Sequence, residues 1–178
     1  MAAIALFSTP LGRCGIVWGD GGIVGLQLPE RDDDRTRARL AERFPNSPER
    51  SLPADVAVVT SRVARLLGGA PEMFDDIKLD MGAVPPFYRR VYEVALTVPP
   101  GSTTTYGDVA RRIGQPGAAR AVGQALGRNP FAPIVPCHRV LGARGAAGGF
   151  SAHGGLRLKQ QLLALEGVTL SPGLPLFV

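Results

Sequence analysis

The chain has 178 residues, of which 45% are apolar, so it can bury one substantial core or two small ones, and a disordered chain is excluded. No run of about 18 apolar residues occurs, and residues 1–11 lack the basic and apolar regions of a secretory signal. We therefore expect a cytoplasmic protein without a membrane-spanning helix. The two cysteines, Cys14 and Cys137, belong to no CxxC pair or histidine-rich cluster, and we expect neither a metal nor a cofactor.

Positive charge is concentrated in the second half of the chain. Residues 1–85 contain 10 Lys and Arg against 12 Asp and Glu, a net charge of −2, whereas residues 86–178 contain 10 against 3, a net charge of +7. Such an asymmetry is typical of a protein that binds a polyanion, because each phosphate that it neutralises releases counterions. Charge alone leaves nucleic-acid binding and a basic surface without a partner as equal alternatives.

Apolar runs separated by Gly- and Pro-containing turns predict a small antiparallel meander in the first half of the chain. The three expected strands cover residues 3–7, 14–18 and 23–28. The acids from Asp32 to Asp34 then start a helix that extends to about Phe44, since the helix dipole favours acids there. We further expect a helix over residues 53–67, a short strand over 74–80 and a linker over 82–86.

The second half begins with an expected helix over residues 87–97. Thr105 and Asp108 form the Ser/Thr-x-x-Asp/Glu pattern of a capping box and start a helix that ends near Ile113. A turn over residues 114–117 leads to a further helix over 118–128. Two helices joined by a short Gly-containing turn are typical of a helix-turn-helix motif, although any helical hairpin shares this pattern.

The second helix of this pair is almost bare of large side chains. Its small residues are Ala118, Ala119, Ala121, Gly123, Ala125 and Gly127. A glycine inside a helix costs roughly 1 kcal/mol relative to alanine, so we interpret the small residues as room for a close neighbour. Arg120, Gln124 and Arg128 recur on one polar face and favour DNA as that neighbour, while tight packing against another helix is the alternative.

Cys137 lies in the segment Pro136-Cys137-His138-Arg139-Val140. A lone cysteine is most often an inert buried thiol. Here the adjacent His138 and Arg139, together with the positive charge of the second half, favour a thiolate nucleophile with a lowered pKa. In an extended segment neighbouring side chains point to opposite faces, so His138 would need a turn or a bridging water to reach the sulfur.

The choice between kinds of cysteine chemistry depends on the histidines. A cysteine hydrolase needs a histidine that moves protons in both half-reactions, and the other candidate is His153 in a Gly-rich stretch. Alkyl transfer to sulfur needs one activation, and its thioether product has no carbonyl group for water to attack. The sequence therefore favours a nucleophile that is used once.

Several motifs of the second half follow one another in a recognisable order. They are Thr105-Tyr106-Gly107, Ala119-Arg120-Ala121-Val122-Gly123, Arg128-Asn129-Pro130, Pro136-Cys137-His138-Arg139-Val140, Gly149-Phe150-Ser151 and Leu162-Leu163-Ala164-Leu165-Glu166-Gly167. From about Phe87 to Gly167 the sequence thereby closely resembles the methylated-DNA–protein-cysteine methyltransferase family, also called O6-alkylguanine-DNA alkyltransferases. It departs from the family at Phe150, where many members have tyrosine, and at Ala152-His153, which lengthens the next loop.

The resemblance implies an α+β protein with two domains. Residues 1–82 would form a small N-terminal antiparallel sheet-and-helix domain with a ribonuclease-H-like outline. Residues 83–178 would form a mostly helical, winged helix-turn-helix-like domain that binds DNA and contains the active site. The implied activity is an irreversible, single-turnover transfer of the alkyl group from O6-alkylguanine in double-stranded DNA, with O4-alkylthymine as a further candidate substrate. The protein would bind the minor groove as a monomer or cooperatively.

The resemblance also implies roles for individual residues. Cys137 would accept the alkyl group, His138 would activate it through a water, and Glu166 would orient the imidazole. Tyr106 would donate a proton to guanine N3, Asn129 would tie the recognition helix to the active-site segment, and Arg120 would replace the flipped nucleotide in the base stack. The other expected DNA-binding residues are Thr105, Ala119, Ala121, Gly123, Gln124 and Arg128. The expected substrate-binding residues are Val140 and Cys137 through their carbonyl groups, Ser151, and Phe150.

Other classes of protein remain as alternatives. A non-catalytic protein that binds alkylated DNA would share the helix-turn-helix but lack the cysteine, so Cys137 is the discriminating residue. A helix-turn-helix transcription regulator would bind a defined sequence, usually as a dimer. A cysteine hydrolase would turn over an ester or amide repeatedly.

Overall fold

The computed structural model describes residues 1–148, 150 and 152–170. They form two compact units. The N-terminal unit comprises residues 1–83 together with 130–134, and the C-terminal unit comprises the described parts of 84–129 and 135–178. Among the described residues, no helix is long and apolar enough to cross a membrane.

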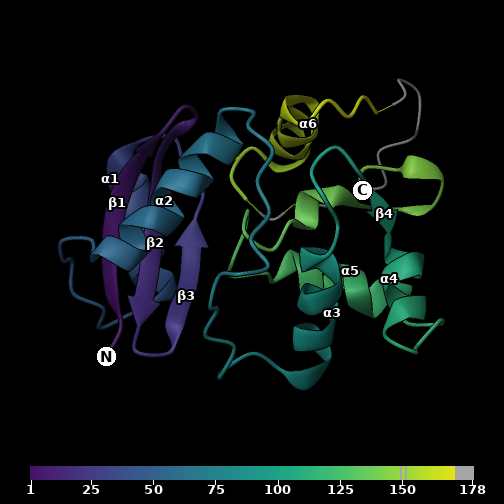
Figure 1. The fold of residues 1–178 in the computed structure, drawn as a ribbon, viewed down its shortest axis with the longest axis horizontal. Coiled ribbons are helices and arrows are strands. Elements are labelled where there is room, and N and C mark those ends of the chain that lie inside the picture. The colour runs from purple at the N-terminus through teal and green to yellow at the C-terminus, as the bar shows by residue number, and fades with distance from the viewer. Residues whose placement is uncertain (149, 151, 171–178) are drawn as a thin grey trace. The chain divides into compact units, whose positions relative to one another are not determined.

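The N-terminal unit is built on an antiparallel sheet with the strand order β1-β2-β3 (Figure 1). The strands are β1 (Ala3–Thr9), β2 (Gly12–Gly19) and β3 (Gly22–Gln27). Ile4 pairs with Val17 on one face, and Ala5 pairs with Ile16 on the other. All four side chains are buried, so both faces of the sheet are covered. The predicted meander is confirmed, with strands slightly longer than the apolar runs.

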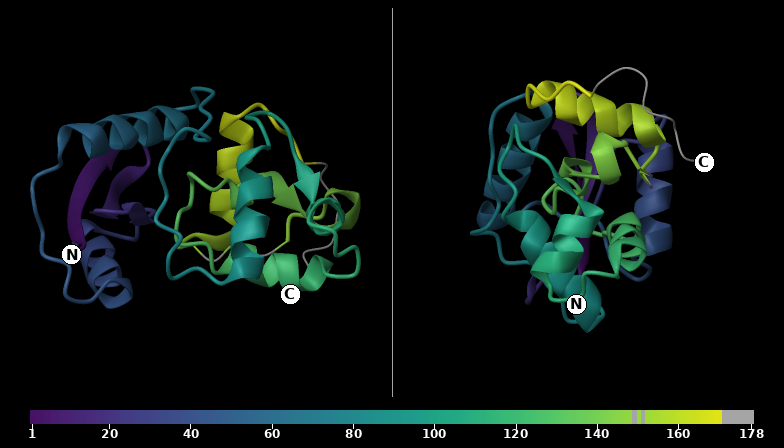
Figure 2. Two further views of the ribbon diagram at one scale, coloured as in Figure 1. Left: turned by 60° about the horizontal axis from the view of Figure 1, so that its bottom comes forward. Right: turned by 90° about the vertical axis from the view of Figure 1, so that its right-hand side faces the viewer.

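Helices α1 (Asp33–Arg43) and α2 (Ala54–Leu67) lie on opposite faces of this sheet (Figure 2). Leu40 of α1 packs with Ile4 and Val17 in one core cluster. The α1 helix begins where the sequence predicts, because the Asp32 side chain accepts a hydrogen bond from Arg35 N and caps the first turn.

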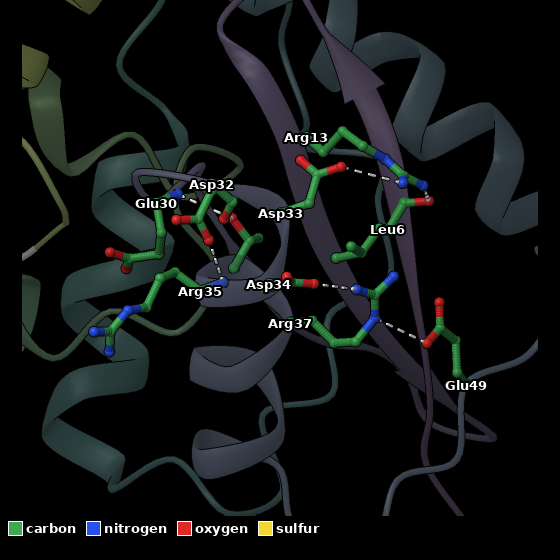
Figure 3. A network of polar contacts seen from close by, with 10 residues as sticks. Leu6, Arg13, Glu30, Asp32, Asp33, Asp34, Arg35, Arg37 and Glu49 are labelled. Carbon is green, nitrogen blue, oxygen red and sulfur yellow. Dashed lines mark hydrogen bonds and ion pairs between the residues drawn. The ribbon is translucent and has the colours of Figure 1, made fainter.

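Charged pairs surround the first turn of α1 (Figure 3). Asp33 pairs with Arg13 of β2 at 3.4 Å, and Arg37 pairs with Asp34 at 3.5 Å and with Glu49 at 3.2 Å. Because these side chains are largely exposed, each pair adds little to the free energy of unfolding. Together they tie α1 to β2 and to the connection that follows the helix.

The short strand predicted over residues 74–80 is wrong. An isolated parallel bridge joins this segment to β3, through hydrogen bonds from Ile23 N to Lys78 O (2.9 Å) and from Asp80 N to Ile23 O (2.7 Å). Phe74 is buried beneath the Arg62 guanidinium of α2, and a turn follows it. The apolar side chain therefore anchors a loop to α2 instead of forming one face of a strand.

The C-terminal unit begins with α3 (Pro86–Leu96), which packs against α4 (Tyr106–Arg112) and α5 (Ala119–Gly127). The predicted capping box is confirmed at the start of α4. The Thr105 side chain accepts a hydrogen bond from Asp108 N, and the Asp108 carboxylate accepts one from Thr105 N. Helix α4, a short turn and α5 form the predicted helix-turn-helix.

The rest of the C-terminal unit follows α5. The 3-10 helix η1 (Cys137–Arg139) leads into β5 (Val140–Leu141), which pairs in parallel with β4 (Thr104–Thr105). The short 3-10 turn η2 (Ala143–Gly145) and helix α6 (Gly155–Leu165) come next. A sheet-and-helix unit and a mostly helical unit together give the α+β class that the sequence predicts.

Candidate active site

Cys137, His138 and Arg139 form a buried turn instead of the extended segment for which the sequence analysis allowed. Cys137 N donates a hydrogen bond to Val135 O (2.8 Å), and Arg139 N donates one to Pro136 O (2.9 Å). A proline is tolerated at position 136, just before the turn, because it has no backbone N–H group that would need a hydrogen-bond partner there. The strict alternation of side chains along a strand does not apply here, and both Cys137 and His138 are buried.

The Cys137 sulfur is surrounded by hydrogen-bond donors. The residue is 6% exposed, and its sulfur interacts with the Asn129 side chain and with the backbone N–H groups of Cys137 and His138. Asn129 also donates from Nδ2 to Val135 O at 2.8 Å. One amide side chain thus connects the end of α5 with the cysteine and its preceding segment. Such donors suit a sulfur that gains negative charge during a reaction.

Burial raises the pKa of the Cys137 thiol, which is opposite to the lowered pKa expected from the sequence. The hydrogen bond from Asn129 and the positive charge of Lys159 act in the other direction and offset the effect of burial only in part. The net charge of the second half is a poor guide to this pKa, because the desolvation of a thiolate outweighs more distant charges. A raised pKa favours the thiol over the thiolate at neutral pH.

Glu166 connects His138 with Arg139. It caps the C-terminus of α6, and its Oε1 lies 2.8 Å from His138 Nε2 and 2.8 Å from Arg139 Nη2. Arg139 Nε lies 3.1 and 3.0 Å from the two carboxylate oxygens, and the three side chains are at most 3% exposed. Burial alone would raise the pKa of Glu166, but the hydrogen bonds from His138 and Arg139 outweigh it and lower the pKa to about 2.

The His138 ring has one nitrogen with a partner and one without. Because Glu166 is ionised, Nε2 carries the proton of the hydrogen bond to Oε1. Nδ1 is buried, and no hydrogen-bond partner for it occurs in the described part of the chain. Burial lowers the pKa of His138, although Glu166 favours the charged ring. A neutral imidazole with its lone pair at Nδ1 can accept a proton.

Arg139 and Lys159 are buried cations at the site. The sequence analysis named Arg139 only as a neighbour of Cys137 that favours the thiolate, and it gave Lys159 no role. Arg139 is 2% exposed, and its Nη1 donates to Val98 O at 2.7 Å. Lys159 is 0% exposed, its Nζ donates to Val140 O at 2.7 Å, and the same atom lies 5.7 Å from the centroid of the Tyr106 ring. Burial lowers the pKa of Lys159 to about 8, and Cys137 acts in the opposite direction. Most lysine and arginine side chains are exposed, and a single sequence does not reveal that these two are buried.

Tyr106 starts α4 and is covered by the backbone of the loop before α6. A side chain at position 148 would place its Cβ 2.5 Å from Tyr106 Oη, and Gly148 has φ +65°, so this approach requires glycine. Burial raises the pKa of Tyr106 to about 12, and the phenol keeps its proton at neutral pH. The neighbouring Thr105 hydroxyl donates to Asp108 Oδ2 at 2.7 Å within the capping box.

Helix α5 presents its polar residues to solvent, as its periodicity indicates. Arg120, Gln124 and Arg128 are exposed, Ala119 and Ala121 are half-buried, and Val122 and Leu126 are buried. Apart from the chain neighbours and the backbone of α5 itself, no atom of the described structure lies within 4 Å of a Cβ placed at Gly123. Within the described residues, tight packing against another helix therefore does not explain this glycine.

The residues expected to bind the substrate are described in part. Val140 is buried in β5, with its carbonyl group on Lys159 Nζ, and Phe150 is half-buried. Ser151 lies outside the described residues. The described part of the chain contains no group of three or more His, Cys, Asp or Glu side chains that could hold a metal ion.

Comparisons with known proteins agree with this arrangement. The family model for the DNA-binding domain of 6-O-methylguanine DNA methyltransferase matches residues 86–168. The methylated-DNA–protein-cysteine methyltransferase of Methanothermobacter thermautotrophicus is 38% identical over 161 residues, which are 90% of this chain and 83% of that protein. The protein of the same name from Mycolicibacterium paratuberculosis is 42% identical over 151 residues, covering 83% and 88%.

A solved structure is similar along almost the whole length. The crystal structure of Mycobacterium tuberculosis OGT in complex with DNA has a TM-score of 0.71 and 35% identity, and the match covers 92% of each chain. Sequence relatives and structural neighbours thus point in the same direction as the cysteine site and the helix-turn-helix. The chain belongs to the methylated-DNA–protein-cysteine methyltransferase family.

Proposed function

We propose that this protein repairs O6-alkylguanine in double-stranded DNA by one irreversible transfer of the alkyl group to Cys137. The observation that carries the proposal is the enclosed Cys137 sulfur, which faces hydrogen-bond donors and adjoins the His138 imidazole that Glu166 holds. The names of the relatives support the reaction, and the relative crystallised with DNA supports the partner.

The transfer begins with loss of the Cys137 proton. His138 Nδ1 accepts this proton through a bridging water, and Glu166 stabilises the imidazolium that results. A base is needed because burial raises the pKa of the thiol. The sulfur then forms a bond to the alkyl carbon while the bond from that carbon to O6 breaks, and the electron pair of the broken bond stays on the guanine.

The departing guanine takes a proton from Tyr106 at N3. The phenol is a donor at neutral pH because burial raises its pKa to about 12, and N3 becomes basic as negative charge develops on the purine. Lys159, whose Nζ lies near the Tyr106 ring, supplies positive charge to the same site. In this proposal the carbonyl groups of Cys137 and Val140 accept hydrogen bonds from the guanine amino group, and Phe150 contacts the purine. Ser151, which lies outside the described residues, would donate a hydrogen bond to O6.

The product explains why each molecule acts once. A thioether lacks the carbonyl group through which water hydrolyses a thioester, so the thiol is not regenerated. The protein is therefore consumed stoichiometrically. O4-alkylthymine also carries its alkyl group on an exocyclic oxygen of the base and is a second substrate class for this chemistry.

We propose that α5 enters the minor groove, where its small residues let the phosphate backbones come close. The exposed Arg120 takes the place of the extruded nucleotide, whose extrusion costs a few kcal/mol. The remaining contacts come from Gln124 and Arg128, from the surface at Ala119, Ala121 and Gly123, and from Thr105 at the start of α4. Asn129 links this helix to Cys137.

Intact-mass analysis after incubation with an O6-methylguanine duplex tests the proposal. We expect one stoichiometric methyl adduct on Cys137 and an unmodified guanine in the duplex. Cys137→Ala should abolish transfer and retain binding of damaged DNA, because the pocket and α5 remain. Cys14→Ala, which changes a buried cysteine of the N-terminal unit, is the matched control and should retain both. An unmodified Cys137 together with an intact lesion would refute the proposal.

A further inference from the structure

The Glu166 carboxylate is shared between two side chains that can both be cations. Arg139 approaches both carboxylate oxygens, and His138 Nε2 shares Oε1 with it. A third donor, Gly101 N, lies 3.4 Å from Oε2. The proposed alkyl transfer uses Glu166 to hold His138, but it gives no role to the arginine that occupies the same carboxylate.

The charge balance of this closed cluster depends on Arg139. Arginine is always charged in proteins, so with Glu166 it forms a pair of zero net charge next to the imidazole. Without the arginine, the buried carboxylate would have His138 as its remaining ionisable partner. A buried anion favours a charged partner strongly, because the low dielectric constant of the interior enlarges their attraction. The imidazole would then bind a proton to neutralise Glu166.

We propose that Arg139 is a positioning residue that neutralises Glu166, so that the carboxylate orients the His138 ring without keeping it protonated, and Nδ1 stays free to accept the Cys137 proton. The groups that act on His138 in the described structure are Glu166, Arg139 and Lys159, and Cys137 adjoins it in η1. Glu166 favours the charged ring, whereas burial and the two cations oppose it. Arg139 thus sets the lower end of the pH range in which His138 is a base.

The inference rests on the proposed function only where it concerns the reaction rate. The protonation state of His138 can be measured without DNA, so a failure of the inference is distinguishable from a failure of alkyl transfer. The chain has two histidines, and the second, His153, is exposed. Ring carbon and nitrogen chemical shifts from NMR therefore give two signals, and His153→Gln assigns them.

In the native protein we expect the His138 signals to show a neutral ring with the proton on Nε2 at pH 7. Arg139→Met, which keeps the length of the side chain and removes its charge, should raise the apparent pKa of His138 by about one unit or more, or about tenfold in proton affinity. Adding Glu166→Gln to this variant should lower that pKa again, because it removes the uncompensated anion. A charged His138 in the native protein at pH 7, or an unchanged titration in folded Arg139→Met, would overturn the inference.

The titration of the native protein shows whether His138 is neutral at pH 7, even if Arg139→Met does not fold. Arg139→Lys provides the second variant, since it retains the charge and loses the bidentate geometry, and its His138 should remain neutral at pH 7. In the rate of methyl transfer, Arg139→Met should lose activity at low pH and approach the native rate as the pH rises. A loss of the same size at every pH would indicate a purely structural role and contradict the proposal.

Discussion

Lys159 places a positive charge in the buried site, and its burial costs free energy. Its described partners are the Val140 carbonyl group and the Tyr106 ring, neither of which is an anion. Such partners stabilise an ammonium group incompletely, and burial therefore lowers the pKa of Lys159 to about 8. We interpret the free-energy cost of burying this ammonium group as the consequence of placing positive charge near the Cys137 sulfur, which becomes an anion in the proposed reaction.

The stability of Lys159→Met should differ from that of the native protein in a pH-dependent way. The pKa of Lys159 is about 8 in the folded protein against an ordinary value of 10.5, so the unfolded chain binds more protons between these values. The native protein thus gains stability as the pH rises through this window, by about 3 kcal/mol at most, and the variant lacks this gain. Urea unfolding of both proteins at pH 7 and near pH 10 measures it, and the same difference at both values would be evidence against it.

The residues of the site were predictable to different degrees. The structure brings Cys137, His138 and Glu166 into one cluster. The order of the motifs along the chain indicated this cluster, but the spacing of the three residues alone did not. The buried positions of Arg139 and Lys159 follow from tertiary packing, which a single sequence does not reveal. The direction of the Cys137 pKa shift was wrong in the sequence analysis for the same reason, because it depends on how fully the turn is enclosed.

At the scale of elements, one side of α5 packs against the protein, and the other side has small residues and no neighbouring element in the described structure. Val122 and Leu126 are buried, and Tyr92 Oη of α3 donates to Ala125 O at 2.8 Å. On the other side, the position of Gly123 opens to empty space. A helix fixed from behind in this way can bring its bare face close to a nucleic acid backbone without being displaced.

Gly123→Ala should therefore change stability and DNA affinity in opposite directions. The added methyl group has room, and alanine is favoured over glycine in a helix by roughly 1 kcal/mol, so the free energy of unfolding should rise. The same methyl group would intrude into the contact with DNA, and affinity for a duplex should fall, more strongly in Gly123→Leu. Thermal melts and fluorescence anisotropy check the two effects. Unchanged affinity in both variants would show that this face does not meet DNA.

Elements whose ends are fixed by hydrogen bonds between nearby residues were predictable from the sequence. Segments whose conformation depends on contacts with other elements were not. The Asp32 cap of α1 and the capping box of Thr105 and Asp108 involve residues three apart, so the sequence contains them completely. The segment at residues 74–80 was expected to be a strand, but Phe74 lies beneath Arg62 of the preceding helix α2, a contact that the local sequence does not reveal. The turn at Cys137 likewise depends on its surroundings.

At the scale of the whole molecule, charge is unevenly divided. Residues 86–178 have a net charge of +7, while residues 1–85 have −2, so the part that contains the helix-turn-helix also provides the attraction for phosphates. This attraction is independent of the lesion and should govern binding to undamaged DNA. Under the proposed function, recognition of the alkylated base is a separate contribution, made by the residues around Cys137.

Two exposed arginines, Arg120 in α5 and Arg128 at its C-cap, should separate these contributions. If Arg128 contacts a phosphate, Arg128→Ala should reduce the slope of log affinity against log salt by about one unit, since fewer counterions are released. Arg120→Ala should leave this slope nearly unchanged and weaken nucleotide flipping, because in the proposed function Arg120 takes the place of the extruded nucleotide and contacts no phosphate. Anisotropy titrations at several salt concentrations and a fluorescent base analogue at the lesion measure the two effects. Identical salt slopes for both variants would contradict this division.

The backbone joins the two units more than once. After Asn129 the chain contributes Pro130–Ile134 to the N-terminal unit, where Leu26 N donates to Pro130 O at 2.8 Å, and it rejoins the C-terminal unit at Val135. A fragment beginning at residue 84 would carry Phe131 and Ile134, which are 0% and 1% exposed in the whole protein, into water. No single proteolytic cut can yield both units intact. A cut after residue 83 leaves the N-terminal fragment without residues 130–134, and a cut after residue 134 leaves it carrying residues 84–129 of the C-terminal unit.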